Sequence, residues 1–404
     1  MAGTNSRCVL IAILLAVSGG AAHAQLRPEA DAVAAAPELL LTRLRTDAYA
    51  YLRFVNRPWI ERVCTVFAEE IRSMPKVRLH GDAHVEQFAL TRDAWGLDDF
   101  DDSAFGPAVV DIVRFLGSVE LVARQRGWAD RRDALFDRFF DGYRRGMTQP
   151  NYRPPRPAIV PRLQTVAFPP REVFLTWGEA KMEAMSGPVL TDIASALNVF
   201  GEQLQKDRPD LPPGYLGLVR AGWLHMGIGS ANTPKFLLRV QGPSSSPNDD
   251  ELLEGKRTGD LSGLPCLDVV TLASTSRIIL GARNIGRLKH NIMVAGPDLP
   301  LPALGGDAST LRHWFIRSWD PTYREVTVSD LRSAKDLSDI VYDAGVQLGQ
   351  GSLREQEDAS IDGPRRQTLE MLGRFEQKIR AETRALVDDL MLGWQQLAAG
   401  KPKD

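Results

Sequence analysis

The chain has 404 residues, of which 44% are hydrophobic and 25% are charged, a composition typical of a globular protein and unlike a disordered, collagen-like or coiled-coil chain. The length allows one large domain or two of medium size. Lys and Arg number 49 against 51 Asp and Glu, with no long block of either sign, so we expect no nucleic-acid partner. Three cysteines are too few for a disulfide scaffold and lack the spacing of zinc ligands.

Residues 1–24 have the features of a secretory signal peptide. Arg7 supplies the positive charge, an apolar run follows at Val9–Val17, and Ala22–Ala24 has the small-x-small pattern of a cleavage site. The apolar run is about half as long as a membrane-spanning helix, and no later run reaches that length. We therefore expect a periplasmic or secreted protein without a transmembrane helix after cleavage. An uncleaved N-terminal anchor is the alternative.

Cleavage would leave two cysteines, Cys64 and Cys266. In an oxidising compartment they could form a disulfide. They could equally be two buried thiols that pack as small hydrophobic side chains. The sequence leaves both arrangements open.

Hydrophobic periodicity predicts mostly helices in residues 25–150. Apolar residues at helical spacing over residues 37–72 predict two helices divided by Pro58. A short strand is expected at Lys76–Leu79, followed by a polar turn, and an amphipathic helix over residues 107–124. This segment therefore combines helices with one strand that leads into its most polar residues.

Two other segments are also predicted to be mainly helical. The segment of residues 151–215 starts with a Pro-rich linker, which belongs to the stretch Gln149–Pro161. Helices are expected after it, over residues 171–207. Residues 326–404 end in a long amphipathic helix over Pro364–Gln396.

Residues 216–325 differ from both flanking segments. They contain glycine clusters and two runs typical of strands, Lys235–Val240 and Arg312–Trp319. Helices around a modest set of strands indicate an α+β fold.

The densest polar segment of the chain holds seven carboxylates within thirty residues. They are Asp82, Glu86, Asp98, Asp99, Asp101, Asp102 and Asp111. Between Leu79 and Val113 the only Lys or Arg is Arg92. Carboxylates packed this closely repel one another unless a cation neutralises them, and oxygen ligands favour magnesium. The alternative is an acidic loop with capping aspartates, including Asp102 at the start of a helix.

The residues of this segment resemble a known superfamily. His80-Gly81-Asp82, an amide five positions later at Gln87, Asp99-Phe100, and Gly106-Pro107 before Asp111 are similar to the motifs of aminoglycoside phosphotransferases and choline kinases. More closely, GDAHVEQF and DDFDDSAFGPAVVDIVRFLGS resemble the bacterial family called domain of unknown function 2252. The resemblance is dense over residues 77–120 and patchy elsewhere.

Downstream segments resemble the same family. Gly227-Ile228-Gly229-Ser230 is similar to its glycine-rich segment, and the strand that ends at Lys256 to its lysine-bearing strand. The glycine segment follows the catalytic motif here, the reverse of an ordinary kinase. The resemblance therefore implies a permuted, protein kinase-like α+β fold with a small sheet lobe and a larger helical lobe.

The resemblance also implies roles for individual residues. The catalytic residues would be Asp82 and His80, of which Asp82 would orient or deprotonate an acceptor hydroxyl. Asp99 would bind magnesium, with Gln87 at the second ligand position and Asp101 beside it. Gly227, Gly229, Ser230 and Lys256 would contact the phosphates of ATP or another nucleotide. Asp111 would brace the catalytic turn.

One departure from the family pattern and the signal sequence bear on activity. Gln87 replaces an asparagine, and its extra methylene moves the amide oxygen by roughly a bond length. An exported protein also meets little ATP. We therefore expect either a magnesium-dependent phosphotransferase that acts on a small or envelope-derived substrate, or a non-catalytic, degenerate kinase-like protein that binds a ligand or partner.

A third hypothesis depends on spacing alone. On an extended strand, His80, Asp82 and His84 would lie on one face and could hold zinc in a hydrolase. Gly81 argues for a turn at this point instead.

Overall fold

The computed structural model describes residues 26–166, 168–225, 235–244, 246–268, 274–295, 314–354 and 362–400. These residues form helices and small antiparallel sheets, so the α+β class is confirmed. The helices are α1 (Ala30–Ala35), α2 (Glu38–Thr46), α3 (Ala48–Phe54), α4 (Asn56–Val66), α5 (Ala68–Ile71), α6 (Val109–Gln125), α7 (Arg132–Thr148), α8 (Ile159–Gln164), α9 (Arg171–Glu179), α10 (Gly187–Asp207), α11 (Ser274–Asn284), α12 (Ala334–Gly351) and α13 (Asp362–Ala399). The strands are β1 (Lys76–Leu79), β2 (Phe88–Leu90), β3 (Trp95–Leu97), β4 (Ala104–Pro107), β5 (Leu218–Trp223), β6 (Lys235–Val240), β7 (Glu251–Arg257), β8 (Met293–Ala295), β9 (Trp314–Ser318) and β10 (Arg324–Glu325).

Most predicted elements are confirmed. β1 and β6 have the predicted bounds, and α6 and α13 lie within a few residues of them. The prediction that Pro58 divides two helices is wrong. Pro58 lies in the first turn of α4, and the helices are interrupted at Asp47 and Val55 instead. A proline in the first turn of a helix removes an N–H group that would have no partner within the helix.

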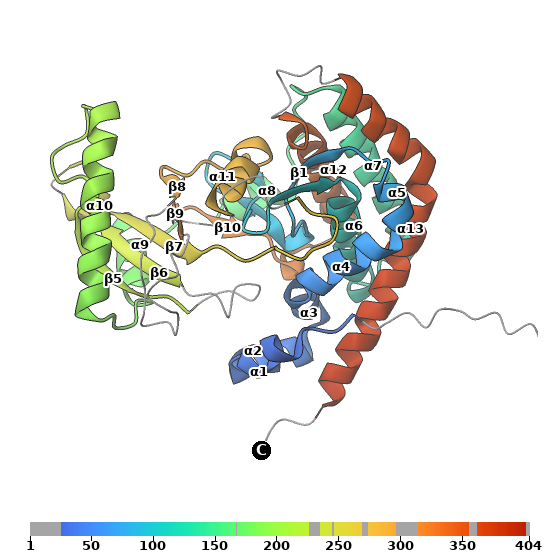
Figure 1. Ribbon diagram of the computed structural model, residues 1–404, viewed down its shortest axis with the longest axis horizontal. Coiled ribbons are helices and arrows are strands. Elements are labelled where there is room, and N and C mark those ends of the chain that lie inside the picture. Colours follow the sequence, from blue (N-terminus) through green and yellow to red (C-terminus); the bar gives the residue numbers. More distant parts are fainter. Residues whose placement is uncertain are drawn as a thin grey trace, which may run out of the picture.

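The helical part of the molecule is built around α6. Nearly every residue of this helix is buried, because α4, α7, α12 and α13 surround it (Figure 1). A mainly apolar helix that is buried on all sides requires such surroundings. The N-terminal end of α6 lies next to the polar segment that follows β1. In the described ranges, no helix combines the length and the apolarity needed to cross a membrane.

The largest sheet is antiparallel, with the strand order β5-β6-β7-β9-β8. Its two faces are covered differently. The helix α10 packs its Val189, Ile193 and Leu197 on one face, and Figure 1 shows it lying alongside these strands. On the other face, Phe174 and Leu175 of α9 cover only part of the surface. The side chains that remain on this second face include Lys256 and its neighbours.

Two smaller sheets position the polar segment. β1 pairs with β4, so the chain beyond Leu79 turns beside Ala104. β2 pairs with β3 and β10, and β3 ends one residue before Asp98. The two ends of the acidic segment are thereby held close to the helical core.

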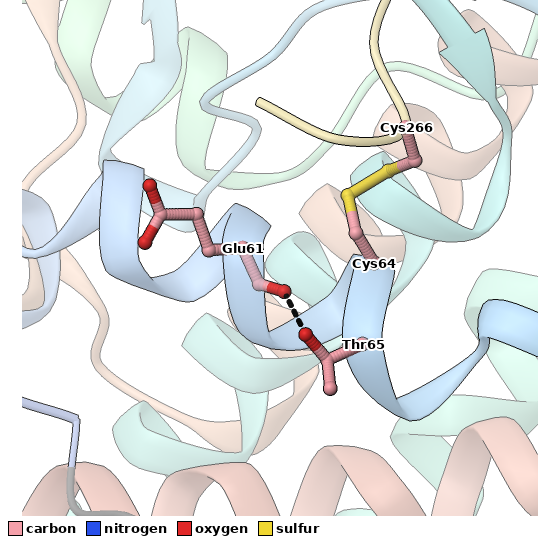
Figure 2. Close-up of a disulfide and its surroundings, with 4 residues drawn as sticks. All are labelled: Glu61, Cys64, Thr65 and Cys266. Carbon is pink, nitrogen blue, oxygen red and sulfur yellow. Dashed lines mark hydrogen bonds between the residues drawn. A yellow bond between two sulfur atoms is a disulfide. The ribbon is translucent and has the colours of Figure 1, made fainter. Parts of the chain in front are cut away.

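A disulfide joins the two cysteines left open by the sequence. Cys64 on α4 bonds to Cys266, which follows β7, across 202 positions of the chain (Figure 2). Figure 2 also shows the α4 turn beside it, where the Thr65 hydroxyl donates a hydrogen bond to the Glu61 carbonyl at 2.9 Å. The segment after β7 is further tied to α4 by Arg57, which donates hydrogen bonds to the carbonyls of Asp260 and Ser262.

Candidate active site

The polar motif begins in a tight turn after β1. Gly81 has a φ of +86°, a conformation that residues with a side chain rarely adopt, and a Cβ at this position would overlap the Asp102 carbonyl. Asp111, near the start of α6, accepts hydrogen bonds from the amides of His80 at 2.7 Å and Gly81 at 2.9 Å. The structure therefore agrees with the expected role of Asp111 as a brace.

Asp82 follows this turn and lines a cavity. The buried guanidinium of Arg114 donates two hydrogen bonds to its Oδ1, at 2.7 and 2.9 Å, and His84 Nε2 lies 3.7 Å from Oδ2. Burial raises the pKa of Asp82 to about 7, although Arg114 opposes the shift. Burial also holds the pKa of His84 well below its usual value, so this imidazole is neutral beside the carboxylate. Asp82 is thus fixed in direction and has a proton affinity suited to a general base.

The second carboxylate group follows β3 and meets a lysine from the largest sheet. Lys256 Nζ on β7 forms an ion pair with Asp99 Oδ1 at 3.3 Å and another with Asp101. Burial alone would raise the pKa of Asp99, but Lys256 and Arg317 hold it well below its usual value. Burial, together with the neighbouring Asp99, raises the pKa of Asp101 to about 6. Residues more than 150 positions apart therefore form one charged centre.

A second ionic network lies beside this centre. Arg317 on β9 contacts Glu254 at 3.1 Å and Asp98 at 3.5 Å. Trp319 Nε1 donates a hydrogen bond to the same Glu254 carboxylate at 3.2 Å. Burial would raise the pKa of Glu254, but the surrounding cations, led by Arg317, lower it to about 2. Glu254 is therefore ionised and held in place.

These groups face one cavity of about 710 Å³. Its polar and charged lining includes Asp82, Gln87, Asp98, Asp99, Asp101, Lys235, Glu254, Lys256 and Arg317. Its apolar wall is formed by Val173, Phe174, Trp177, Leu224, Leu288 and Trp319. The Trp177 and Trp319 rings lie 5.7 Å apart between their centroids. The cavity is thus lined by both aromatic and ionic side chains, and its volume is that of a small-molecule site.

The structure brings most of the predicted site residues together. Asp82, Gln87, Asp99, Asp101 and Lys256 all line this cavity. The predicted residues Gly227, Gly229 and Ser230 lie outside the described residues.

His80 occupies a different position from these cavity residues. It is fully buried, its Nε2 lies 3.0 Å from the Asp98 carbonyl, and its ring packs against Phe100. These contacts join the turn that carries Asp82 to the loop of Asp99.

Several cavity residues were missed by the sequence analysis. They are Arg53, Lys235, Glu254 and Arg317, together with Arg114 behind Asp82. The sequence does point to Glu254, because residues two apart on a strand share a face and Lys256 is a predicted site residue. Lys235 and Arg317 depended on the pairing register of three strands, which the sequence does not define.

Three residues that line the cavity carry oxygen atoms of the kind that a hard divalent cation binds. Asp99 and Asp101 supply carboxylate oxygens, Gln87 supplies an amide oxygen, and magnesium uses few protein ligands and completes its shell with water or phosphate oxygens. Lys256 already places a positive charge between the two carboxylates. In the part of the chain that the structure describes, no three His, Cys, Asp or Glu side chains form a metal-binding cluster.

The zinc hypothesis is wrong in its premise. The segment with His80, Asp82 and His84 is a turn around Gly81 and not an extended strand. The capping hypothesis is also wrong for Asp102, which accepts a hydrogen bond from Asn56 at 2.8 Å, whereas α6 begins after Ala108.

Comparison with known proteins gives one result. Residues 34–170 match a family described as "uncharacterized protein conserved in bacteria (DUF2252)". This range contains Asp82, Gln87, Asp99, Asp101 and Asp111 but ends before the largest sheet. No curated protein and no solved structure matches the chain.

Proposed function

We propose that the protein is an exported, magnesium-dependent phosphotransferase with a permuted kinase-like arrangement, acting on a small or envelope-derived acceptor. The observation that carries the proposal is the pairing of Lys256 with Asp99 and Asp101 in the cavity that Asp82 also lines. Phosphoryl transfer needs a lysine and a metal site for the phosphates and a carboxylate for the acceptor. Lys256 lies 157 positions from Asp99 along the chain, so its meeting with the acidic segment is not a result of sequence proximity.

The order of elements in the largest sheet supports this proposal. Protein kinases carry the phosphate-binding lysine on the third strand, after a glycine-rich loop that covers the phosphates. Lys256 lies on β7, the third strand of this sheet in chain order, and Gly227 and Gly229 fall between the first and second strands. The helix α11 follows between the third and fourth strands. The catalytic turn precedes all of these elements, which is the permutation.

In this mechanism each charged residue of the cavity would have a separate role in phosphoryl transfer. Asp82 accepts the proton of the acceptor hydroxyl as the acceptor oxygen bonds to phosphorus and the bond from phosphorus to the donor oxygen breaks. Arg114 keeps Asp82 oriented, and Lys256 binds phosphate oxygens. A bound magnesium ion, held by Asp99, Asp101 and Gln87, would neutralise the phosphate charge.

Two features support export. Residues 1–24 have the pattern of a signal peptide, and the Cys64–Cys266 disulfide is of a kind that persists in oxidising compartments. A periplasmic or secreted location would require a phosphoryl donor that occurs there.

The test is phosphate transfer by the purified chain with Mg²⁺ and a set of phosphate donors and hydroxyl acceptors. We expect turnover that EDTA abolishes and that Asp82→Asn lowers by about 10²–10⁴-fold. Asp99→Ala should weaken Mg²⁺-dependent donor binding. The matched control is Asp339→Asn on α12, whose carboxylate pairs with exposed Lys335. No turnover, with donor binding unchanged in Asp82→Asn, would favour a second candidate.

That second candidate is a non-catalytic protein that binds a ligand or a partner. The replacement of the expected asparagine by Gln87 supports it, because metal sites tolerate little displacement of a ligand. Gln87→Asn separates the two candidates. It should raise the turnover of an enzyme and have no such effect on a protein without catalysis.

A further inference from the structure

Two lysines stand side by side on the sheet face above the cavity. Lys235, the first residue of β6, pairs in register with Lys256 on β7. Side chains of directly opposed residues on antiparallel strands start about 5 Å apart on the same face. Both lysines are 5% exposed, and both line the cavity. Two lysine side chains thus lie next to each other in the lining of the cavity.

The direct opposition of two buried lysines carries an electrostatic cost, which the carboxylates of Asp99, Asp101 and Glu254 offset in part. Like charges directly opposite each other destabilise a sheet, and burial of an ammonium group adds to the cost. Burial, with a contribution from Lys256, lowers the pKa of Lys235. Unfavourable charge placement of this kind is concentrated at binding sites, where a ligand offsets it.

The next positions on the same face are also ionic. Glu254 lies directly opposite Arg317 in the β7–β9 register, and the two form an ion pair. The strands therefore carry three cations and one carboxylate on this face, and Asp98, Asp99 and Asp101 pair with two of these cations. Such a surface suits phosphate oxygens and offers no apolar face for a base, whereas the aromatic side chains Phe174, Trp177 and Trp319 line another part of the cavity.

We propose that Lys235 and Lys256 together form a subsite for a phosphoanhydride chain, in which the two ammonium groups contact different phosphoryl groups. The donor is then recognised by its chain of phosphates. The assignment of this subsite to the donor rests on the proposed function, but the binding itself does not. A nucleoside triphosphate and an inorganic polyphosphate present the same chain.

The experiment is calorimetric titration of the full mature chain with tripolyphosphate and, separately, with ATP, each with Mg²⁺. Wild-type protein should bind tripolyphosphate, and Lys235→Met should weaken the binding by about tenfold or more, the effect expected for loss of a charged hydrogen bond. The matched control is Lys335→Met on α12, whose ammonium group is exposed and pairs with Asp339. Equal affinity for the two ligands would indicate an inorganic donor, and tighter binding of ATP would indicate a nucleotide.

Measuring the stability of the Lys235 variants shows whether weaker binding comes from loss of a ligand contact or from loss of the fold. Urea denaturation shows whether Lys235→Met is folded, and loss of binding counts only for a variant that unfolds in one cooperative transition, as wild type does. Lys235→Gln serves if the methionine variant does not fold. The inference is wrong if wild type does not bind tripolyphosphate, or if the folded Lys235 variants bind it as tightly as wild type.

The two proposals fail in different ways. A chain that binds tripolyphosphate through Lys235 but transfers no phosphate retains this subsite and rejects the phosphotransferase. A chain that transfers phosphate equally well with Lys235→Met retains the phosphotransferase and rejects this subsite.

Discussion

The carboxylate of Asp111 accepts a hydrogen bond from the backbone amide of His80 at 2.7 Å, across 31 positions of the chain. Its other oxygen accepts one from Gly81 at 2.9 Å. Both amides are thereby satisfied in a region without access to water, and the turn that carries Asp82 is fixed to the start of α6. Since α6 is the central helix of the molecule, the position of Asp82 depends on the helical core and not on the loop itself.

Removal of this brace should cost stability. Asp111→Ala leaves two buried amides without acceptors, and we expect the free energy of unfolding to fall by about 2–4 kcal/mol. Asp111→Asn retains one acceptor oxygen and should lose less. Urea denaturation followed by circular dichroism measures both. Equal stability of Asp111→Ala and wild type would contradict this account of the turn.

A matched pair of glycine substitutions tests the close approach at Gly81. Gly81→Ala should unfold or strongly destabilise the chain, because its Cβ would overlap the Asp102 carbonyl. Gly127 has a similar φ of +72°, but a Cβ there meets no atom within 4 Å. Gly127→Ala should therefore cost only the backbone strain of about 1–2 kcal/mol. Thermal denaturation of the two variants should differ accordingly, and similar melting temperatures would show that the contact with Asp102 is unimportant.

The pH dependence of phosphate transfer should follow Asp82. Burial raises the pKa of this residue to about 7, and only its carboxylate form accepts a proton. We therefore expect kcat/KM to fall as the pH drops below about 7. A pH–rate profile measures this dependence, and a flat profile through neutral pH would exclude Asp82 as the base.

The same shift predicts an effect on stability with a definite sign. The pKa of Asp82 lies above its ordinary value of 3.8, so the folded chain binds a proton that the unfolded chain has lost over the window from about pH 4 to 7. The contribution of this group to stability therefore falls as the pH rises through that window. Asp82→Asn lacks this dependence, so its stability relative to wild type should be higher at pH 8 than at pH 5. Urea titrations at the two values give the difference.

The disulfide should contribute measurably to stability. Cys64→Ser with Cys266→Ser should lower the free energy of unfolding by about 2–4 kcal/mol. Treatment of wild type with dithiothreitol should shift the urea midpoint in the same direction and leave the double variant unchanged. Alkylation of both cysteines in folded, unreduced protein would contradict the pairing.

The sequence was sufficient where local pattern decides the structure. Alternating and clustered hydrophobic residues defined β6 and α13, and the spacing from Asp82 to Asp99 and Asp111 identified the acidic segment that the fold assembles. In contrast, Lys235 could not be found, because its place beside Lys256 is a matter of strand register. Register depends on turns and on both faces of a sheet, which are tertiary features.

Other parts of the structure required three-dimensional information for different reasons. A proline is read as a break in a helical pattern, yet Pro58 sits where a helix loses nothing by it. The pairing of Cys64 with Cys266 spans 202 residues, a separation that carries no geometric content by itself. Arg114, the partner of Asp82, lies on an apolar helix and is distinguished in the sequence by nothing except its charge.

The covalent bond at Cys266 also restricts how the site can exchange its contents. The segment that follows Lys256 forms part of the cavity wall through Gly259, Asp260 and Leu264, and it is fastened to α4 at its far end. The disulfide therefore limits how far the segment after β7 can move away from α4 on this side of the cavity. Widening of the cavity at this side therefore requires local rearrangement of the segment between Arg257 and Cys266.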